Sequence, residues 1–505
     1  IKEGKKMSAI ITEKFRQHNA TQFFESFTEA SKSTYYLFIG KATAYTTATT
    51  TGSDSSPPTP ADAVGETEYY AWDSMLAAKN IASSDITYAL PRRNWTNGTT
   101  YDMYKHDISS SSTSTSGASN IYDSTFYFLT SDNRVYKVLD NNAGTAYSGS
   151  EPTSESTSPF ALGGYVLKYM YSITSSEAAK YLTSDFMPVS TDTTVSAAAT
   201  DGKIESLSIT AGSGYTNGTY YAAVYGDGTS AGTSSGAIVR ITVSGGAIAS
   251  FGLTAGTDTT IHSGGAAYTY GSVNLGSSYT FSDSGLSSSA SMGSGTGGAV
   301  DVIISPKNGH GNDAVIELGG HYVMTATTLT QAENDDVTTA NDFRQVGIVV
   351  DPTTYGTTTV ATSSTARQTF IVKMSSSSGT FEVDEKISQA STGAIGKVVE
   401  WDSTRSLLYF QQERFGDFGT NSTTGDNTAF SGANLITGAS SSATGTPSTT
   451  TETVTLPNSN TVSLTTGYAN PELQPDSGNI IYLENRKPIS RSSDQTEDIK
   501  VIIEF

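Results

Sequence analysis

The sequence contains no cysteine and has far fewer basic than acidic residues. Without cysteine, a disulfide framework, a thiolate metal site and a cysteine nucleophile are all excluded. The 29 Lys and Arg residues against 49 Asp and Glu residues give a formal net charge of −20. This charge argues against nucleic acid or an anionic membrane as a partner, because both attract clustered cations.

Long apolar runs are also missing. No run approaches the roughly 20 residues needed to span a bilayer, and the first residues lack the apolar core of a signal peptide. We therefore expect a protein that is made in the cytoplasm and does not insert into a membrane. In this prediction the fold starts at Met7, and residues 1–6 have no assigned role.

The residues that are abundant favour strands. Charged residues make up only 15% of the chain, and Gly, Ser and Thr fill much of the rest, which disfavours long helices and suits short strands joined by turns. Aromatic residues, mostly Tyr and Phe, reach 10%, which is too many for a disordered chain. We predict a mainly β, multidomain fold with short helices.

Two stretches differ in composition from the rest and are predicted to be inserted small β modules. Residues 200–305 are rich in Gly, Ser and Thr, and "KIESLSITAG" at 203–212 returns as "AIASFGLTAG" at 247–256. Residues 356–455 alternate like strands between low-complexity, linker-like flanks. The remaining segments would form one discontinuous β-rich body: residues 7–195, 306–355 and 456–505.

Several elements of this body can be predicted locally. Phe15, Phe23, Phe24 and Phe27 have a spacing compatible with one amphipathic helix. "ETEYYAWDSMLAAKNI" at 66–81 suits a second short helix. "STFYFLTSDNRVYKVLD" predicts a β-hairpin that turns at residues 131–133.

No motif predicts an enzyme, a metal site or a cofactor. His310 and His321, with Asp313 and Glu317 between them, could in principle offer nitrogen and oxygen ligands, but their spacing matches no standard metal motif. We interpret both histidines as ordinary surface imidazoles. Adjacent carboxylates such as Asp384 and Glu385 point to opposite faces of a strand and do not supply the geometry of a glycosidase.

The short cluster "LPRRNW" at 90–95 is the most basic in this acidic chain. Pro91 restricts the backbone, so that Arg92 and Arg93 are presented from a defined turn beside Trp95. A solvated loop is one interpretation of the cluster. A protein interface is the other, because Arg and Trp are enriched among interface hot spots.

The C-terminal stretch "IIYLENRKPISRSSDQTEDIKVIIEF" at 480–505 predicts two strands around a polar turn. Pro488 is expected to end the first strand, and residues 494–498 to form the turn. The apolar "VIIEF" would then be a buried last strand that completes the body, which explains how it can lack a polar tail.

This stretch resembles the baseplate wedge subunit of T4-like contractile-tailed phages, the subunit that is a dimer in each wedge. The resemblance extends, in the family's order, to "AIITEKFR" at 9–16, "LPRRNW", "LGGYVLKYMYSI" at 162–173 and "DFRQVGIVVDP" at 342–352, but not to the two predicted modules. It implies a non-enzymatic structural protein of the virion tail baseplate, made in the host cytoplasm. The implied partners are a second copy of the chain and other wedge subunits, which the protein would hold together during assembly and contraction.

Six residues are candidates for the partner interface, and one alternative function remains open. The candidates are Arg92, Arg93, Trp95, Arg486, Asp494 and Glu497. The alternative is a tail-associated protein that binds or depolymerises carbohydrate, suggested by the repeated β motifs and the many tyrosines. Host surface carbohydrate would be a partner only under this alternative.

Overall fold

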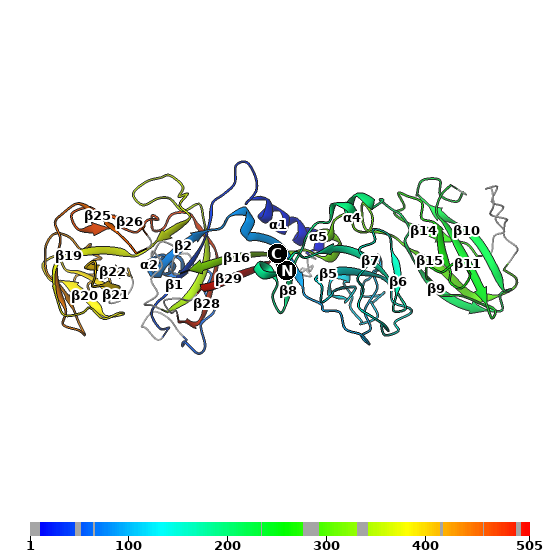
Figure 1. Cartoon of the computed structure of the whole chain (residues 1–505), viewed down its shortest axis with the longest axis horizontal. Coiled ribbons are helices and arrows are strands. Elements are labelled where there is room, and N and C mark those ends of the chain that lie inside the picture. The colour runs from blue at the N-terminus through cyan, green and yellow to red at the C-terminus, as the bar shows by residue number, and fades with distance from the viewer. Residues whose placement is uncertain are drawn as a thin grey trace, which may run out of the picture. The chain divides into compact units, whose positions relative to one another are not determined.

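The computed structural model describes residues 11–45, 52–63, 66–233, 235–275, 292–330, 342–414, 418–457, 459–490 and 496–505. Strands dominate these residues, and the α-helices among them have 13 residues or fewer (Figure 1). The mainly β, multidomain prediction is confirmed. The predicted start at Met7 and the candidate residue Asp494 lie outside the described residues.

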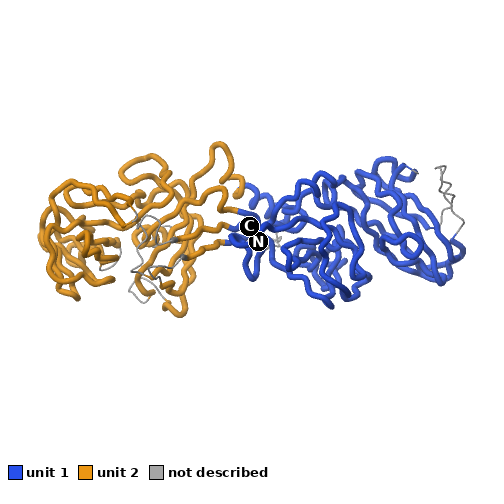
Figure 2. Tube along the Cα trace, in the orientation of Figure 1, with its two compact units in different colours: residues 1–22, 87–324, 502–505 blue, residues 23–86, 325–501 orange. Residues whose placement is uncertain are grey.

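The chain divides into two compact units, each built from separate segments (Figure 2). Unit 1 contains residues 1–22, 87–324 and 502–505, and unit 2 contains residues 23–86 and 325–501. Each unit includes one of the two ranges that we predicted as inserted modules. The division into one body and two inserts remains a prediction.

A four-stranded antiparallel sheet forms one part of unit 1. Its order is β4-β5-β7-β6, and its aromatic core includes Phe126, Phe128 and Tyr171. A second pairing, β3 with β8, lies beside this core. The strands are β3 (Ile86–Pro91), β4 (Tyr127–Leu129), β5 (Arg134–Asp140), β6 (Phe160–Leu162), β7 (Tyr165–Ser172) and β8 (Phe186–Pro188).

The second part of unit 1 covers the first predicted module. Here β15 pairs along β9, and β12, β11, β10 and β14 form a sheet in that order, with β13 also beside β11. Leu139 and Val166 of the neighbouring sheet pack into the same core. The strands are β9 (Ser206–Ser213), β10 (Gly218–Gly226), β11 (Ile238–Ser244), β12 (Ala247–Ile248), β13 (Thr260–Ser263), β14 (Gly271–Val273) and β15 (Thr296–Ile303).

The central sheet of unit 2 is antiparallel and has the order β18-β2-β1-β17-β28. Every residue of β1 is buried, as expected for its apolar sequence "YYLFIG". In addition, β29 (Thr496–Glu504) neighbours β16 (Tyr322–Thr330). The strands of the central sheet are β1 (Tyr35–Gly40), β2 (Met75–Asn80), β17 (Phe343–Val350), β18 (Thr365–Arg367) and β28 (Asn479–Ile489).

The second sheet of unit 2 closes on itself. Its order is β22-β21-β20-β23-β24-β19-β27, and an additional pairing joins β22 to β19, which makes a six-stranded ring with its own apolar core. A separate hairpin, β25 (Glu452–Thr455) with β26 (Thr461–Leu464), follows. The strands of the sheet are β19 (Phe370–Ser378), β20 (Lys386–Gln389), β21 (Ala394–Asp402), β22 (Leu407–Gln411), β23 (Ile436–Gly438), β24 (Thr444–Pro447) and β27 (Tyr468–Ala469).

The helices agree with the sequence only in part. The predicted first helix is confirmed as α1, but Phe15 is 54% exposed and Phe27 lies beyond the helix end. The predicted second helix is too long: α2 ends at Ser74, and the apolar "MLAAKN" continues as β2 because it pairs with β1. The helices are α1 (Glu13–Glu25), α2 (Glu66–Ser74), η1 (Ser83–Asp85), η2 (Ile121–Asp123), α3 (Ser175–Tyr181), α4 (Thr193–Ala198) and α5 (Ala314–Leu318).

The hairpin prediction is confirmed, whereas the two copies of the internal repeat fold differently. Strands β4 and β5 pair as an antiparallel hairpin, and Asn133 has a φ of 61° in its turn. Residues 203–212 supply most of the long strand β9. Residues 247–256 supply only the two-residue strand β12, so the sequence repeat is not a structural repeat.

The C-terminal prediction needs two corrections. Strand β28 continues through Pro488 to Ile489, because β28 is an edge strand and its register to β17 shifts between the Gln345–Asn485 and Phe343–Ile489 pairs. A proline is tolerated at such an irregular edge position. Within "VIIEF" only Val501 is buried, while Ile502, Ile503 and Phe505 remain partly exposed.

Candidate partner-binding surface

A groove in unit 2 brings together two of the six candidate residues. Arg486 on β28 and Glu497 on β29 both line it, although they come from different strands. The groove has a volume of about 460 Å³. We call it the C-terminal groove and define it by its lining residues: Phe343, Val346, Arg486, Ile489, Glu497, Asp498, Ile499 and Lys500.

The irregular pairing of β17 with β28 positions one wall of the groove. The register shift leaves two backbone carbonyls, those of Arg344 and Arg486, pointing at the hydroxyl of Tyr45. Tyr45 donates to these carbonyls, at 2.6 and 2.9 Å, and is itself buried. Burial raises the pKa of Tyr45 to about 12, so the hydroxyl keeps its proton and remains a donor at neutral pH.

Charged side chains surround an apolar floor in this groove. Phe343 and Val346 lie beneath it and are already fully buried, so the apolar surface that a partner could cover comes from the partly exposed Ile489 and Ile499. The Arg486 side chain is 46% exposed, and its guanidinium lies 3.4 Å from Glu484. An exposed, loosely paired arginine at the edge of an apolar floor is free to pair with another protein. Glu497 is buried. The Asp498 carboxylate accepts a hydrogen bond from the Thr328 hydroxyl at 2.7 Å.

The sequence missed the apolar residues of the groove. Phe343 and Val346 belong to "DFRQVGIVVDP", which contributed to the family resemblance but carried no interface prediction. Their signal is weak because apolar residues in a strand are as typical of a core as of a groove floor.

The "LPRRNW" cluster lies in unit 1, and its two arginines are braced internally. Arg93 donates to the carbonyls of Tyr122, at 2.9 Å, and Ser124, and its guanidinium stacks on Tyr127 at 4.4 Å. Arg92 donates to the side chain of Asn94 at 2.8 Å and to the Thr183 carbonyl at 2.7 Å. The predicted turn is wrong: the cluster is an extended segment that continues from β3, and Asn94 bridges to Leu129.

Trp95 is anchored in the same way. It packs against the unit 1 core, and its ring meets Tyr147 edge-on with 5.7 Å between centroids. The three candidate residues of the cluster, Arg92, Arg93 and Trp95, keep intermediate exposure. A partner contact through them stays a prediction.

The interpretation of His310 and His321 as surface imidazoles is wrong, since both are buried. His310 packs edge-on against Tyr104, and His321 lies 3.5 Å from Glu13. Burial lowers the pKa of both histidines. Within the described ranges, no three His, Asp or Glu side chains gather in an arrangement that would hold a metal ion.

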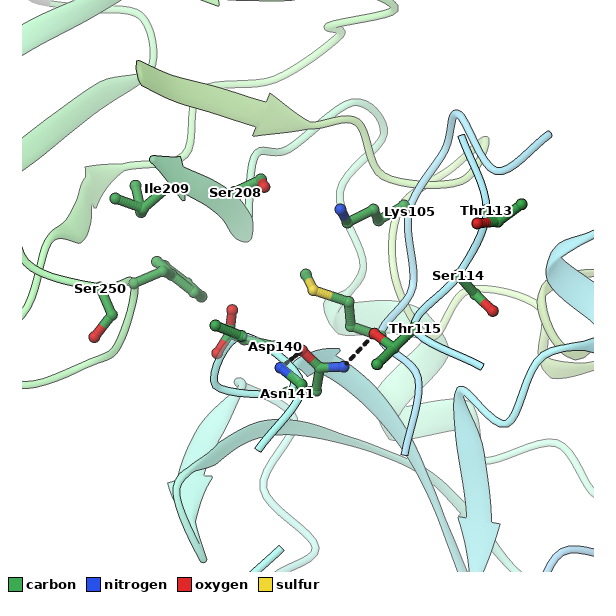
Figure 3. A pocket seen from close by; sticks show the side chains of 13 residues that line it. Lys105, Thr113, Ser114, Thr115, Asp140, Asn141, Ser208, Ile209 and Ser250 are labelled. Atoms are coloured by element: carbon green, nitrogen blue, oxygen red, sulfur yellow. Dashed lines mark hydrogen bonds between the residues drawn. The ribbon is translucent and has the colours of Figure 1, made fainter. Parts of the chain in front are cut away.

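A second cavity, in unit 1, has a more polar lining (Figure 3). Its volume is about 270 Å³, and it lies where the end of β5 meets β9. Asp140 and Lys105 line it together with several Ser and Thr residues, and Asn141 beside them donates to Thr115 at 3.0 Å. Burial raises the pKa of Asp140 to about 6, and the Asn142 N–H that donates to it at 2.8 Å opposes this shift.

This raised pKa predicts a pH-dependent gain in stability for Asp140→Asn. The folded chain binds the Asp140 proton more tightly than the unfolded chain, so the contribution to stability is complete below pH 3.8 and lost as pH rises through about 6. Asparagine imitates the protonated carboxyl. We expect it to raise the free energy of unfolding by about 3 kcal/mol at pH 8 and by less than about 1 kcal/mol at pH 4.

Chemical denaturation of the two proteins at both pH values measures this difference. Asp301→Asn, at an exposed position of β15, is the matched control and should leave stability unchanged at either pH. A gain in stability for Asp140→Asn of equal size at pH 4 and pH 8 would contradict the raised pKa of Asp140.

A protein-family model matches part of the chain. The protein-family model described as "Bacteriophage T4, Gp8" matches residues 9–148 and 447–505. The chain is similar to a phage baseplate protein. The two Gp8-like segments, as we call residues 9–148 and 447–505, make up less than half of the chain. No curated protein matches it.

The Gp8 match supports a structural subunit of a phage baseplate, located in the virion. All six candidate interface residues fall within the Gp8-like segments, as do three of the five resembling motifs. The motifs at 162–173 and 342–352 lie outside the match. In the described part of the chain, no helix is both long and apolar enough to cross a membrane.

Proposed function

We propose that this protein is a subunit of the wedge of a phage tail baseplate and that it acts without catalysis. In this role it holds neighbouring wedge proteins together during tail assembly and contraction. The observation that carries the proposal is the Gp8 match, which includes the two C-terminal strands, β28 and β29. The proposed partners are a second copy of the chain and other wedge subunits.

The C-terminal groove is the surface that we assign to a wedge partner. It combines an apolar floor with exposed charge, and β28 presents a strand edge with no neighbouring strand among the described residues. Strand edges and apolar floors are both features that protein partners cover. A dimer of chains that each carry a net charge of −20 would further need a largely uncharged contact area.

The substitution Arg486→Ala tests this assignment. Loss of its exposed, 3.4 Å ion pair with Glu484 should change stability by less than about 1 kcal/mol. If Arg486 is an interface anchor, its loss should weaken association by tenfold or more, the typical effect of about 1.4 kcal/mol or above. Light scattering of the chain alone and reconstitution with the other wedge subunits measure self-association and wedge assembly.

Lys487→Ala is the matched control, because adjacent residues of a strand point to opposite faces and Lys487 does not line the groove. The unsubstituted chain should scatter as twice its 53.0 kDa mass. Equal wedge assembly by the Arg486 and Lys487 variants would exclude the C-terminal groove as the partner site. A monomeric mass at every concentration would exclude the dimer.

A further inference from the structure

Three titratable side chains meet in the interior of unit 1 without contact with solvent. Lys137 on β5 and Glu317 on α5 are 180 residues apart in sequence, and their side chains are 0% and 2% exposed. The Lys137 ammonium nitrogen, Nζ, lies 2.8 Å from Glu317 Oε2. His310, also fully buried, places its Nδ1 3.9 Å from the same oxygen.

Lys137 has the surroundings of a nucleophilic amine. Its Nζ lies 4.0 Å from the centre of the Tyr104 ring, which covers it with an apolar face. Burial lowers the pKa of Lys137, although Glu317 opposes this shift. The proposed reaction starts with the transfer of one proton within the Lys137–Glu317 hydrogen bond, which turns the ion pair into an amine and a carboxylic acid.

The hydrogen bonds to the Glu317 carboxyl group suit an electrophile. Its Oε1 accepts hydrogen bonds from the backbone N–H groups of Gly311, at 2.7 Å, and Asp313, at 3.3 Å. Two N–H groups aimed at one oxygen stabilise the negative charge that this oxygen gains when a nucleophile adds to the carboxyl carbon. The other oxygen, Oε2, faces Lys137 and His310 and is therefore placed to leave.

His310 is the proton relay in the proposed reaction, and its Nδ1 must close the 3.9 Å gap to Glu317 Oε2 to form the hydrogen bond that carries the proton. Its ring packs edge-on against Tyr104, with 5.0 Å between centroids. Neither ring nitrogen has a hydrogen-bond partner among the described residues, although both are buried. Burial, reinforced by the charges of Lys137 and Lys168, keeps the pKa of His310 well below its usual range. The neutral imidazole can accept one proton while it donates another.

We propose that Lys137 and Glu317 condense to an intramolecular isopeptide bond. The neutral Nζ of Lys137 attacks the carboxyl carbon of Glu317, and a C–N bond forms while negative charge collects on Oε1. One proton passes from the nitrogen through His310 to Oε2, the C–Oε2 bond breaks, and one water molecule leaves. Amine and carboxylic acid give amide and water, so the reaction is balanced without an oxidant, a reductant or a cofactor.

The fold supplies the geometry and the isolation from water that this condensation needs. A hydrogen bond of 2.8 Å leaves Nζ close to the carboxyl carbon, near the separation of about 3 to 3.5 Å from which bound groups react. The product would replace two buried charges by one neutral amide. It would also join β5 to α5 covalently and close a loop that contains all of residues 200–305.

Mass spectrometry of the purified, full-length chain tests the proposal. We expect an intact mass lower than the sequence mass by one water molecule. A dehydrated Asp–Gly step such as Asp201–Gly202 would give the same difference, so the deciding observation is a tryptic peptide. We expect a branched peptide that joins residues 135–168 to residues 308–344 and is not cleaved after Lys137.

Three variants separate the bond from an ordinary ion pair. Lys137→Met removes the nucleophile and should restore the full mass. Glu317→Gln retains the carbonyl carbon, so any condensation there must release ammonia in place of water. His310→Ala leaves both reacting groups present and should increase the unreacted fraction in freshly folded protein.

The unsubstituted chain decides the outcome even if these variants fold poorly. Full sequence mass together with normal tryptic cleavage after Lys137 would show that the two residues form only an ion pair and would overturn the proposal. A branched peptide that persists in Lys137→Met would likewise refute the assignment of Lys137 as the nucleophile.

Discussion

Deletion of residues 499–505 should leave a chain that aggregates or unfolds. The deletion removes most of β29, which neighbours β16, together with the buried Val501 and the partly buried Ile499, Ile502, Ile503 and Phe505. Fully burying a large apolar side chain is worth about 1.5 to 3 kcal/mol. One full and four partial contributions therefore add up to roughly 5 kcal/mol or more, which rivals the 5–15 kcal/mol net stability of a typical domain.

The end of the strand also has specific contacts within unit 1 that the deletion would remove. Arg16 donates to the carbonyl of Phe505 at 2.5 Å and pairs with the Glu504 carboxylate. The Phe505 N–H donates to the carbonyl of His321 at 3.1 Å. Without residues 504 and 505, the α1 residue Arg16 and the buried His321 lose these partners, which adds the cost of unpaired polar groups.

Thermal unfolding and size-exclusion chromatography of the truncated chain measure this effect. Val501→Ala is the control, since it removes only part of one buried side chain and should remain folded with a loss of about 1 to 2 kcal/mol. A truncated chain that is monodisperse and unfolds at the original temperature would refute the structural role of β29. If that chain also failed to assemble with wedge subunits, β29 would serve the partner interface alone.

Gly347→Ala should be the most destabilising single methyl addition in the central sheet of unit 2. Gly347 lies in the middle of β17, opposite Phe38 on one side and Leu483 on the other. A Cβ atom there would lie 2.3 Å from the Phe38 ring and 2.7 Å from the Tyr482 carbonyl oxygen. Phe38 is fully buried and has no room to move aside. Overpacking of this kind typically costs 1–3 kcal/mol, and we expect about 3 kcal/mol.

A double substitution tests whether the clash with the Phe38 ring causes the loss of stability in Gly347→Ala. Phe38→Leu alone should destabilise by removing ring contacts, but combined with Gly347→Ala it makes room for the new methyl group. The two losses measured by chemical denaturation should then sum to more than the loss of the double variant. Strictly additive losses would show that the Phe38 ring is not the obstacle.

The candidate interface could be predicted from the sequence only in part. The two apolar runs and the polar residues between them predicted two strands, and β28 and β29 form there, although β28 pairs with β17 and β29 with β16. The prediction that Pro488 ends the first strand failed, because it treated the strand as regular, whereas an edge position and a register shift accommodate the proline. The location of the Phe343 floor beside Arg486 depends on the pairing of β17 with β28, which no local pattern specifies.

By itself, the sequence determined the elements whose cause is local. The Gly, Ser and Thr content and the alternating apolar runs fixed a mainly β chain, and the polar residues 131–133 fixed the β4–β5 turn. The tertiary structure alone decided which side chains meet across long separations. It made Arg93 an internal brace, buried His310, and placed Glu317 against Lys137 from 180 residues away. Local propensities act over a few residues, whereas such contacts depend on how distant strands pack, and that depends on the whole chain.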